Sequence, residues 1–142
     1  MVANALVRGS YVSLQSALAF HGMIPESVHT VTSVTHRRGR RFTTPLGGFI
    51  FHNIHPRLLS GYVAEVIAGQ DAFVARPEKA LLDLLHLVPG TDDPAFLEEL
   101  RLRLDSFDLG LFESWAEGRP KLLRAAGHLR RMLETEAAFR PA

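Results

Sequence analysis

The chain has 142 residues, a formal net charge of +1 and no cysteine. This length suits one domain that buries its core without staples, and the missing cysteine excludes disulfides, zinc–thiolate sites and cysteine nucleophiles. We therefore expect a single domain over residues 1–142. The first residues lack a charged segment followed by a long apolar run, so we expect no secretory signal, no membrane partner and a cytoplasmic location.

Charge is divided unevenly along the chain. Up to Gly61 there are six arginines and one acid, Glu26, which gives this part a charge of +5. From Tyr62 onward, ten lysines and arginines face fourteen acids, a charge of −4. The first part is therefore suited to contact phosphates or an acidic partner.

Residues 10–22 are typical of a capped helix. Ser13 is a suitable N-cap, Gly22 is suited to a left-handed residue after the helix, and Leu14, Ala17, Leu18 and His21 share one face.

The segment that follows is rich in β-branched and aromatic residues, which predicts strands. A turn at 37–40 and a second at 45–48 would make the first three a meander. In the first strand Val31 and Val34 would face opposite ways, through either a bulge or burial on both faces. The expected strands are 28–35, 41–44, 49–54, 62–67 and 72–75.

Residues 77–88 predict the central helix. Pro77 suits the first helical position, Glu78 suits the positive first turn, and Pro89-Gly90 ends the helix. Leucine and alanine occupy nearly all of its circumference, which indicates a helix that other elements surround. Lys79, Asp83 and His86 lie on one narrow stripe.

Three further helices are expected after Gly90. Asp93 with Pro94 and Asp108 are suitable N-terminal caps for the first two, and Pro120 begins the third, longer one. Strands first and helices afterwards favour an α+β fold: a mostly antiparallel sheet of about five strands, packed on a buried central helix, with further helices at the C-terminus.

The sharpest candidate contact surface is the turn with Arg37, Arg38, Arg40 and Arg41, four arginines in five residues. Guanidinium groups at a hairpin tip can bind phosphates in a bidentate manner. The alternative is an exposed edge whose charges discourage strand pairing between molecules.

A second, weaker candidate is the stripe Lys121, Arg124, His128 and Arg131 on the last helix. It lies opposite the apolar face formed by residues such as Leu122, Ala126 and Leu129. An ordinary solvated helix face explains it equally well.

A metal-dependent hydrolase would need acids and a lysine that converge, and Glu65, Asp71 and Lys79 are the candidates. Lys79 with Asp83, however, is explained as an i, i+4 helix pair. The histidines lack ligand spacing, and there is no nucleophile elbow, P-loop or dinucleotide motif. We therefore predict no catalytic, metal-binding or cofactor-binding residues.

Several ordered blocks resemble AbiEi-family antitoxins of type IV bacterial toxin–antitoxin systems. The blocks are YVSLQSAL at 11–18, HGMIPE at 21–26, VTSVT at 31–35, RFTTPLG at 41–47 with Phe49, Gly61-Tyr62, and ARPEKALLDLL at 75–85. Beyond residue 90 the similarity is only a general helical character.

The resemblance implies a non-enzymatic antitoxin, of a family often described as transcriptional regulators. Such a protein counters a nucleotidyltransferase-type toxin, generally without a stable complex. Relatives usually carry an N-terminal winged helix that binds the promoter, and we expect that domain to be absent from 1–142. The alternative is a nucleic-acid-binding module that uses the Arg37–Arg41 turn and the Lys121–Arg131 face.

Overall fold

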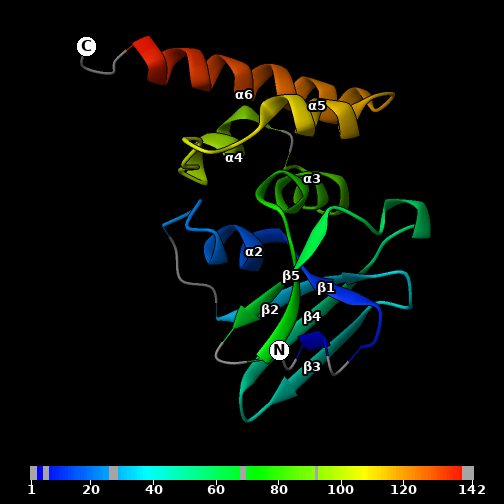
Figure 1. Cartoon of the computed structure of the whole chain (residues 1–142). Coiled ribbons are helices and arrows are strands. Elements are labelled where there is room, and N and C mark those ends of the chain that lie inside the picture. The colour runs from blue at the N-terminus through cyan, green and yellow to red at the C-terminus, as the bar shows by residue number, and fades with distance from the viewer. Residues whose placement is uncertain (1–2, 5–6, 26–28, 68–69, 92, 139–142) are drawn as a thin grey trace.

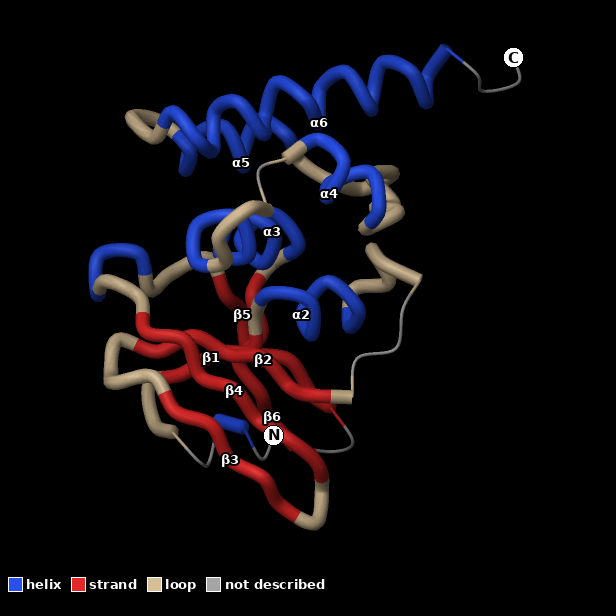
Figure 2. The backbone as a smooth tube through the Cα atoms, turned by 180° about the vertical axis from the view of Figure 1, so that it is seen from behind, coloured by secondary structure: helices blue, strands red, loops and turns tan. Residues whose placement is uncertain are grey.

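The computed structural model describes residues 3–4, 7–25, 29–67, 70–91 and 93–138. In this part of the chain one sheet of six strands is covered by helices, which confirms the α+β prediction. Figures 1 and 2 show the sheet at one end of the molecule, α2 (Leu14–Phe20) and α3 (Pro77–Leu87) in the middle, and the later helices at the other end.

The sheet has the order β3-β4-β2-β1-β6-β5. Antiparallel pairs join β1 to β2, β3 to β4 and β5 to β6, whereas β2–β4 and β1–β6 are parallel. The strands are β1 (Ser10–Val12), β2 (Thr30–Thr35), β3 (Arg40–Thr44), β4 (Gly47–Asn53), β5 (Tyr62–Ile67) and β6 (Gln70–Ala75).

The strand missing from the prediction is β1, which lies in the middle of the sheet. The helix does begin at Leu14 and end before Gly22, which has a φ of +71° as expected. The three residues before Ser13 instead pair with β2 and β6 and are buried. A segment this short shows no clear periodicity, and its pairing partners lie far away in sequence.

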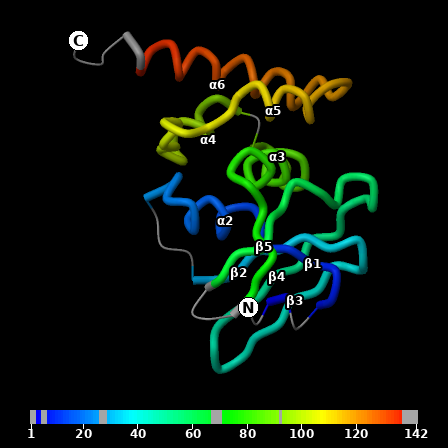
Figure 3. Tube along the Cα trace, viewed as in Figure 1, coloured from blue at the N-terminus to red at the C-terminus, as the bar shows by residue number. Residues whose placement is uncertain are grey.

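The predicted meander is wrong in its pairing. Chain order puts β3 between β2 and β4, but β4 lies beside β2 in parallel and β3 takes the edge (Figure 3). Burial explains this arrangement, because Phe49 and Phe51 of β4 are buried whereas Arg40 and Arg41 of β3 are exposed. A charged strand is tolerated at an edge, where it also hinders pairing between molecules.

For the first predicted strand, the sequence left open a bulge or burial on both faces, and the structure decides between them for the second half of β2. Ser33, Val34 and Thr35 are all buried, so both faces of β2 are covered there. Val28 lies outside the described residues.

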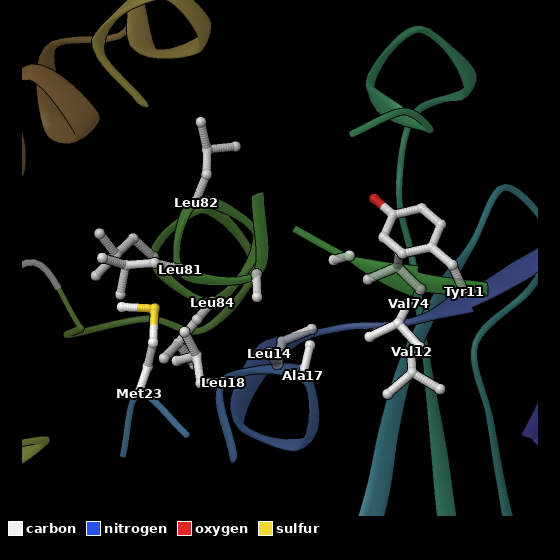
Figure 4. Packing of buried hydrophobic residues seen from close by; sticks show 14 of the residues in the cluster. Tyr11, Val12, Leu14, Ala17, Leu18, Met23, Val74, Leu81, Leu82 and Leu84 are labelled. Carbon is white, nitrogen blue, oxygen red and sulfur yellow. The ribbon is translucent and has the colours of Figure 1, made fainter. Parts of the chain in front are cut away.

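The central helix α3 is enclosed as predicted. Figure 4 shows Leu81 and Leu84 directed toward Met23 and Leu18, while Leu82 points the other way. All three leucines are at most 1% exposed. Because α3 is covered on opposite sides by α2 and by the C-terminal helices, it connects those helices to the sheet.

The C-terminal helices begin where the sequence predicts. Asp93 accepts a hydrogen bond from Ala95 N before α4 (Pro94–Glu99), and Asp108 accepts one from Leu111 N before α5 (Leu109–Ala116). The long α6 (Pro120–Ala138) packs through a row of apolar residues, Leu122, Ala125, Ala126 and Leu129. Among the described residues no helix is both long and apolar enough to cross a bilayer.

Candidate functional site

A buried polar network lies between β1 and α3. Lys79 Nζ is 2.5 Å from Asp83 Oδ1, and it also donates to Tyr11 Oη at 3.0 Å and to the carbonyl oxygen of Leu58 at 2.7 Å. Asp83 Oδ2 accepts from Tyr11 Oη at 2.9 Å and from Ser13 Oγ at 2.7 Å. We call these four side chains, Tyr11, Ser13, Lys79 and Asp83, the core network.

The local backbone explains why these groups meet. Lys79 and Asp83 are four residues apart and therefore share one face of α3. Tyr11 and Ser13 are two residues apart in extended backbone, so both side chains leave the same face of the strand. Directly afterwards, Leu14 has a φ of +55°, a strained conformation for a leucine that turns the chain sharply into α2.

The hydrogen bonds account for the polar atoms in the core network. The ammonium of Lys79 has three acceptors, both oxygens of Asp83 are occupied, and the hydroxyl of Tyr11 both donates and accepts. Residue exposure is 1% for Tyr11, 2% for Lys79 and 0% for Asp83. Two opposite charges can be buried in this way because each is neutralised and hydrogen-bonded at once.

Burial is also the main influence on proton binding here. It raises the pKa of the Asp83 carboxyl, against the opposing effects of the Lys79 charge and of the hydrogen bonds from Lys79, Ser13 and Tyr11. Burial and the neighbouring Asp83 carboxylate raise the pKa of Tyr11 far above its usual range. The phenol therefore stays protonated and keeps donating to Asp83.

Aromatic side chains and a glycine pack closely against the core network. The ring of Tyr62 stacks on Tyr11 with 4.7 Å between centroids, and Phe73 meets Tyr62 edge-on at 5.7 Å. Gly61 lies so close that an added Cβ would be 2.7 Å from Lys79 Cγ and 3.0 Å from the Trp115 ring. Such close packing makes the core network a structural connection that is closed to a substrate.

The sequence identified the Lys79–Asp83 pair correctly but not its burial or its partners. The sequence did contain an indication that the pair is buried, because Lys79 and Asp83 lie in a helix that is otherwise apolar around most of its circumference. The spacing Tyr11-x-Ser13 on an extended segment is the complementary signal. Neither segment points to the other, since about seventy residues separate them.

The hydrolase candidates do not converge. Glu65 is the register partner of Ala72, and Asp71 is the partner of Val66, so the two acids lie on opposite faces of the β5–β6 hairpin. Lys79 is engaged in the core network. Within the described residues, no group of three His, Asp or Glu side chains is placed to hold a metal ion.

The four arginines lie at the sheet edge and all are exposed. The predicted hairpin tip is wrong, because β4 lies between β2 and β3 and those two strands do not pair. Arg37 and Arg38 belong to the connection from β2 to β3, and Arg40 and Arg41 begin β3. Asn53 Nδ2 holds this connection through the carbonyl oxygens of His36 (3.2 Å) and Arg37 (2.8 Å). We call Arg37, Arg38, Arg40 and Arg41 the arginine edge.

The charge of the arginine edge affects the neighbouring side chain of His52. The pKa of His52 is lowered, first by burial and then by the nearby guanidinium of Arg41. The salt bridges recorded between described residues include none of the four arginines. The positive charge at this edge therefore faces solvent.

The stripe on α6 is divided between two clefts. Half-buried Lys121 lines a cleft beside the short helix η1 (Pro56–Leu58). Exposed Arg124 and Arg131, with half-buried His128, line another beside Asp93 and Pro94.

Lys121 and His128 are half-buried, so the face of α6 opposite Leu122, Ala126 and Leu129 is only partly the solvated face that the alternative interpretation assumes. Figure 1 shows α6 and β3 at opposite ends of the molecule. The predicted contact residues consequently form separate surfaces.

Comparison with known proteins adds no family assignment. No family model matches the chain, and no curated protein matches it.

The core network predicts a large effect of removing one charge. Asp83→Ala leaves the buried ammonium of Lys79 without its counter-charge, and we expect a loss of about 3–5 kcal/mol in the free energy of unfolding. Urea titration measures it. The double variant Lys79→Met, Asp83→Leu should be more stable than Asp83→Ala, because no lone charge remains.

An exposed pair supplies the control for that experiment. Glu113→Ala breaks the contact with Arg130 on the surface and should cost less than about 1 kcal/mol. If Asp83→Ala costs no more than Glu113→Ala, the assigned role of the core network is wrong.

Gly61 gives a second test of the same region. Gly61 and Gly22 have similar φ values of +76° and +71°, but a Cβ at Gly22 would meet nothing within 4 Å. Alanine at Gly22 should therefore cost only the backbone strain, about 1–2 kcal/mol. Gly61→Ala should cost about 1–3 kcal/mol more through the clash with Lys79, and equal losses in urea titrations would contradict the packing.

Proposed function

We propose that this chain is a non-enzymatic antitoxin of the AbiEi kind, a regulator-like domain of a bacterial type IV toxin–antitoxin system that acts in the cytoplasm. Its counterpart would be a nucleotidyltransferase-type toxin, countered with or without direct contact. The ordered sequence blocks that resemble this family support the proposal.

The observation that carries the proposal is the place of the resembling residues. Tyr11 and Ser13 of the first block contact Lys79 and Asp83 of the last, and Gly61 of the block between them packs on Lys79. The blocks thus specify one shared interior, as the common scaffold of a family would. Because this interior is closed, the proposal assigns function to contacts at the surface.

The arginine edge is the surface that we assign to this function. Its four guanidinium groups lie on a connection anchored by Asn53 and on an edge strand. Arginine there can pair with the carboxylates of a protein or with phosphates, and it loses little ordering entropy because the backbone is already fixed.

Co-expression tests the antitoxin role. Growth arrest by a nucleotidyltransferase-type toxin, expressed from a neighbouring gene of that kind, should be relieved by the wild-type chain. The variant Arg37→Gln, Arg38→Gln, Arg40→Gln, Arg41→Gln should relieve it less, and Arg8→Gln, Arg103→Gln should relieve it fully, since those arginines are exposed elsewhere. Continued arrest with soluble wild-type protein would refute the proposal.

A nucleic-acid-binding module is the second candidate, favoured by the exposed charge of the arginine edge. If each arginine neutralises one phosphate, the logarithm of the affinity for single-stranded nucleic acid should fall with the logarithm of salt concentration, with a slope of about −0.7 per phosphate. The fourfold glutamine variant should flatten this slope. Fluorescence anisotropy measures it, and absence of binding at low salt would exclude this candidate.

A further inference from the structure

A cleft of about 490 Å³ lies where three distant parts of the chain meet. Its walls come from η1 and the residue before it, from the last turn of α3, and from the connection between α5 and α6 together with the first turn of α6. This volume is in the range of pockets that hold small molecules.

Three of the residues that line the cleft carry a positive charge. These are Arg57, Arg119 and Lys121, and the imidazole rings of His55 and His86 lie beside them in the lining. Of the described residues that line the cleft, none is acidic. Three positively charged residues around one cleft, with no acid among its described lining residues, favour an anionic ligand over a neutral or cationic one.

Two further features bear on the positive charge around the cleft. Burial lowers the pKa of His86, and the charges of Arg119, Lys79 and Lys121 lower it further, while Asp83 opposes them. In addition, α6 begins here, and the free N–H groups of its first turn add the positive end of the helix dipole.

The remainder of the lining is apolar. Leu58, Pro120 and Leu122 form part of the wall, and the flat rings of His55 and His86 also line it. Leu122 is 1% exposed and therefore a fixed part of the core. A site for a bare anion needs no such surface, whereas a ligand with a planar apolar body and a phosphate chain uses both.

We propose that this cleft binds a nucleotide. Arg57, Arg119 and Lys121 pair with the phosphate oxygens, and the base packs on the apolar wall beside Leu58 and Pro120. The proposal goes beyond the antitoxin function and does not depend on it, since the cleft lies apart from the arginine edge.

Isothermal titration calorimetry at low salt tests the proposal, with ATP and pyrophosphate as probes. We expect ATP to bind the wild-type chain, and pyrophosphate to bind at least about tenfold more weakly because it has no base. In the variant Arg57→Gln, Arg119→Gln, Lys121→Gln, ATP affinity should fall by about tenfold or more. All three side chains are exposed or half-buried, so the fold should persist, which circular dichroism checks.

The matched control removes the same number of charges elsewhere. Arg8→Gln, Arg101→Gln, Arg103→Gln should leave ATP affinity unchanged within about twofold, since these exposed residues lie outside both the cleft and the arginine edge. Absence of ATP binding, equal loss in both triple variants, or pyrophosphate binding as tight as that of ATP would each overturn the proposal.

Discussion

The arrangement of this fold depends on one buried ion pair. Lys79 and Asp83 lie on the helix that every layer contacts, and neither charge could remain there alone, because an isolated buried charge costs several kcal/mol. The donors and acceptors that satisfy them come from Tyr11 of β1, from Ser13 just after that strand, and from Leu58 at the end of η1. Polar atoms require particular partners at particular distances, whereas leucines pack in many ways. The pair therefore fixes how α3 lies on the sheet.

This constraint explains features that look unfavourable one at a time. β1 has only three residues, yet it occupies a central place in the sheet, where it directs Tyr11 and Ser13 toward α3. Leu14 adopts a left-handed conformation because the chain must leave the strand immediately after Ser13. Gly61 must lack a side chain because the stem of Lys79 occupies that space. Each local cost is offset by the completed core network.

The sequence predicted what is encoded locally. Helix starts at Asp93, Asp108 and Pro120, the enclosed helix at Pro77 and the five longer strands each carry their signal within a few residues, and the structure contains them all. It did not predict β1, the parallel pairing of β2 with β4, or the partners of Lys79. These depend on contacts across long separations, which no single segment records. For the same reason the arginines were recognised as a cluster, but the sequence did not decide between a hairpin tip and the exposed sheet edge on which they lie.

The charge count of the sequence misled in a comparable way. It divides the chain into a basic first part and an acidic second part. The basic cleft, however, joins Arg57 from the first part to Arg119 and Lys121 from the second. The core network is what makes this meeting possible, since Lys79 binds the carbonyl oxygen of Leu58 and so holds η1 against α3. The same buried ammonium that fixes the sheet on its helix thereby also positions one wall of the cleft.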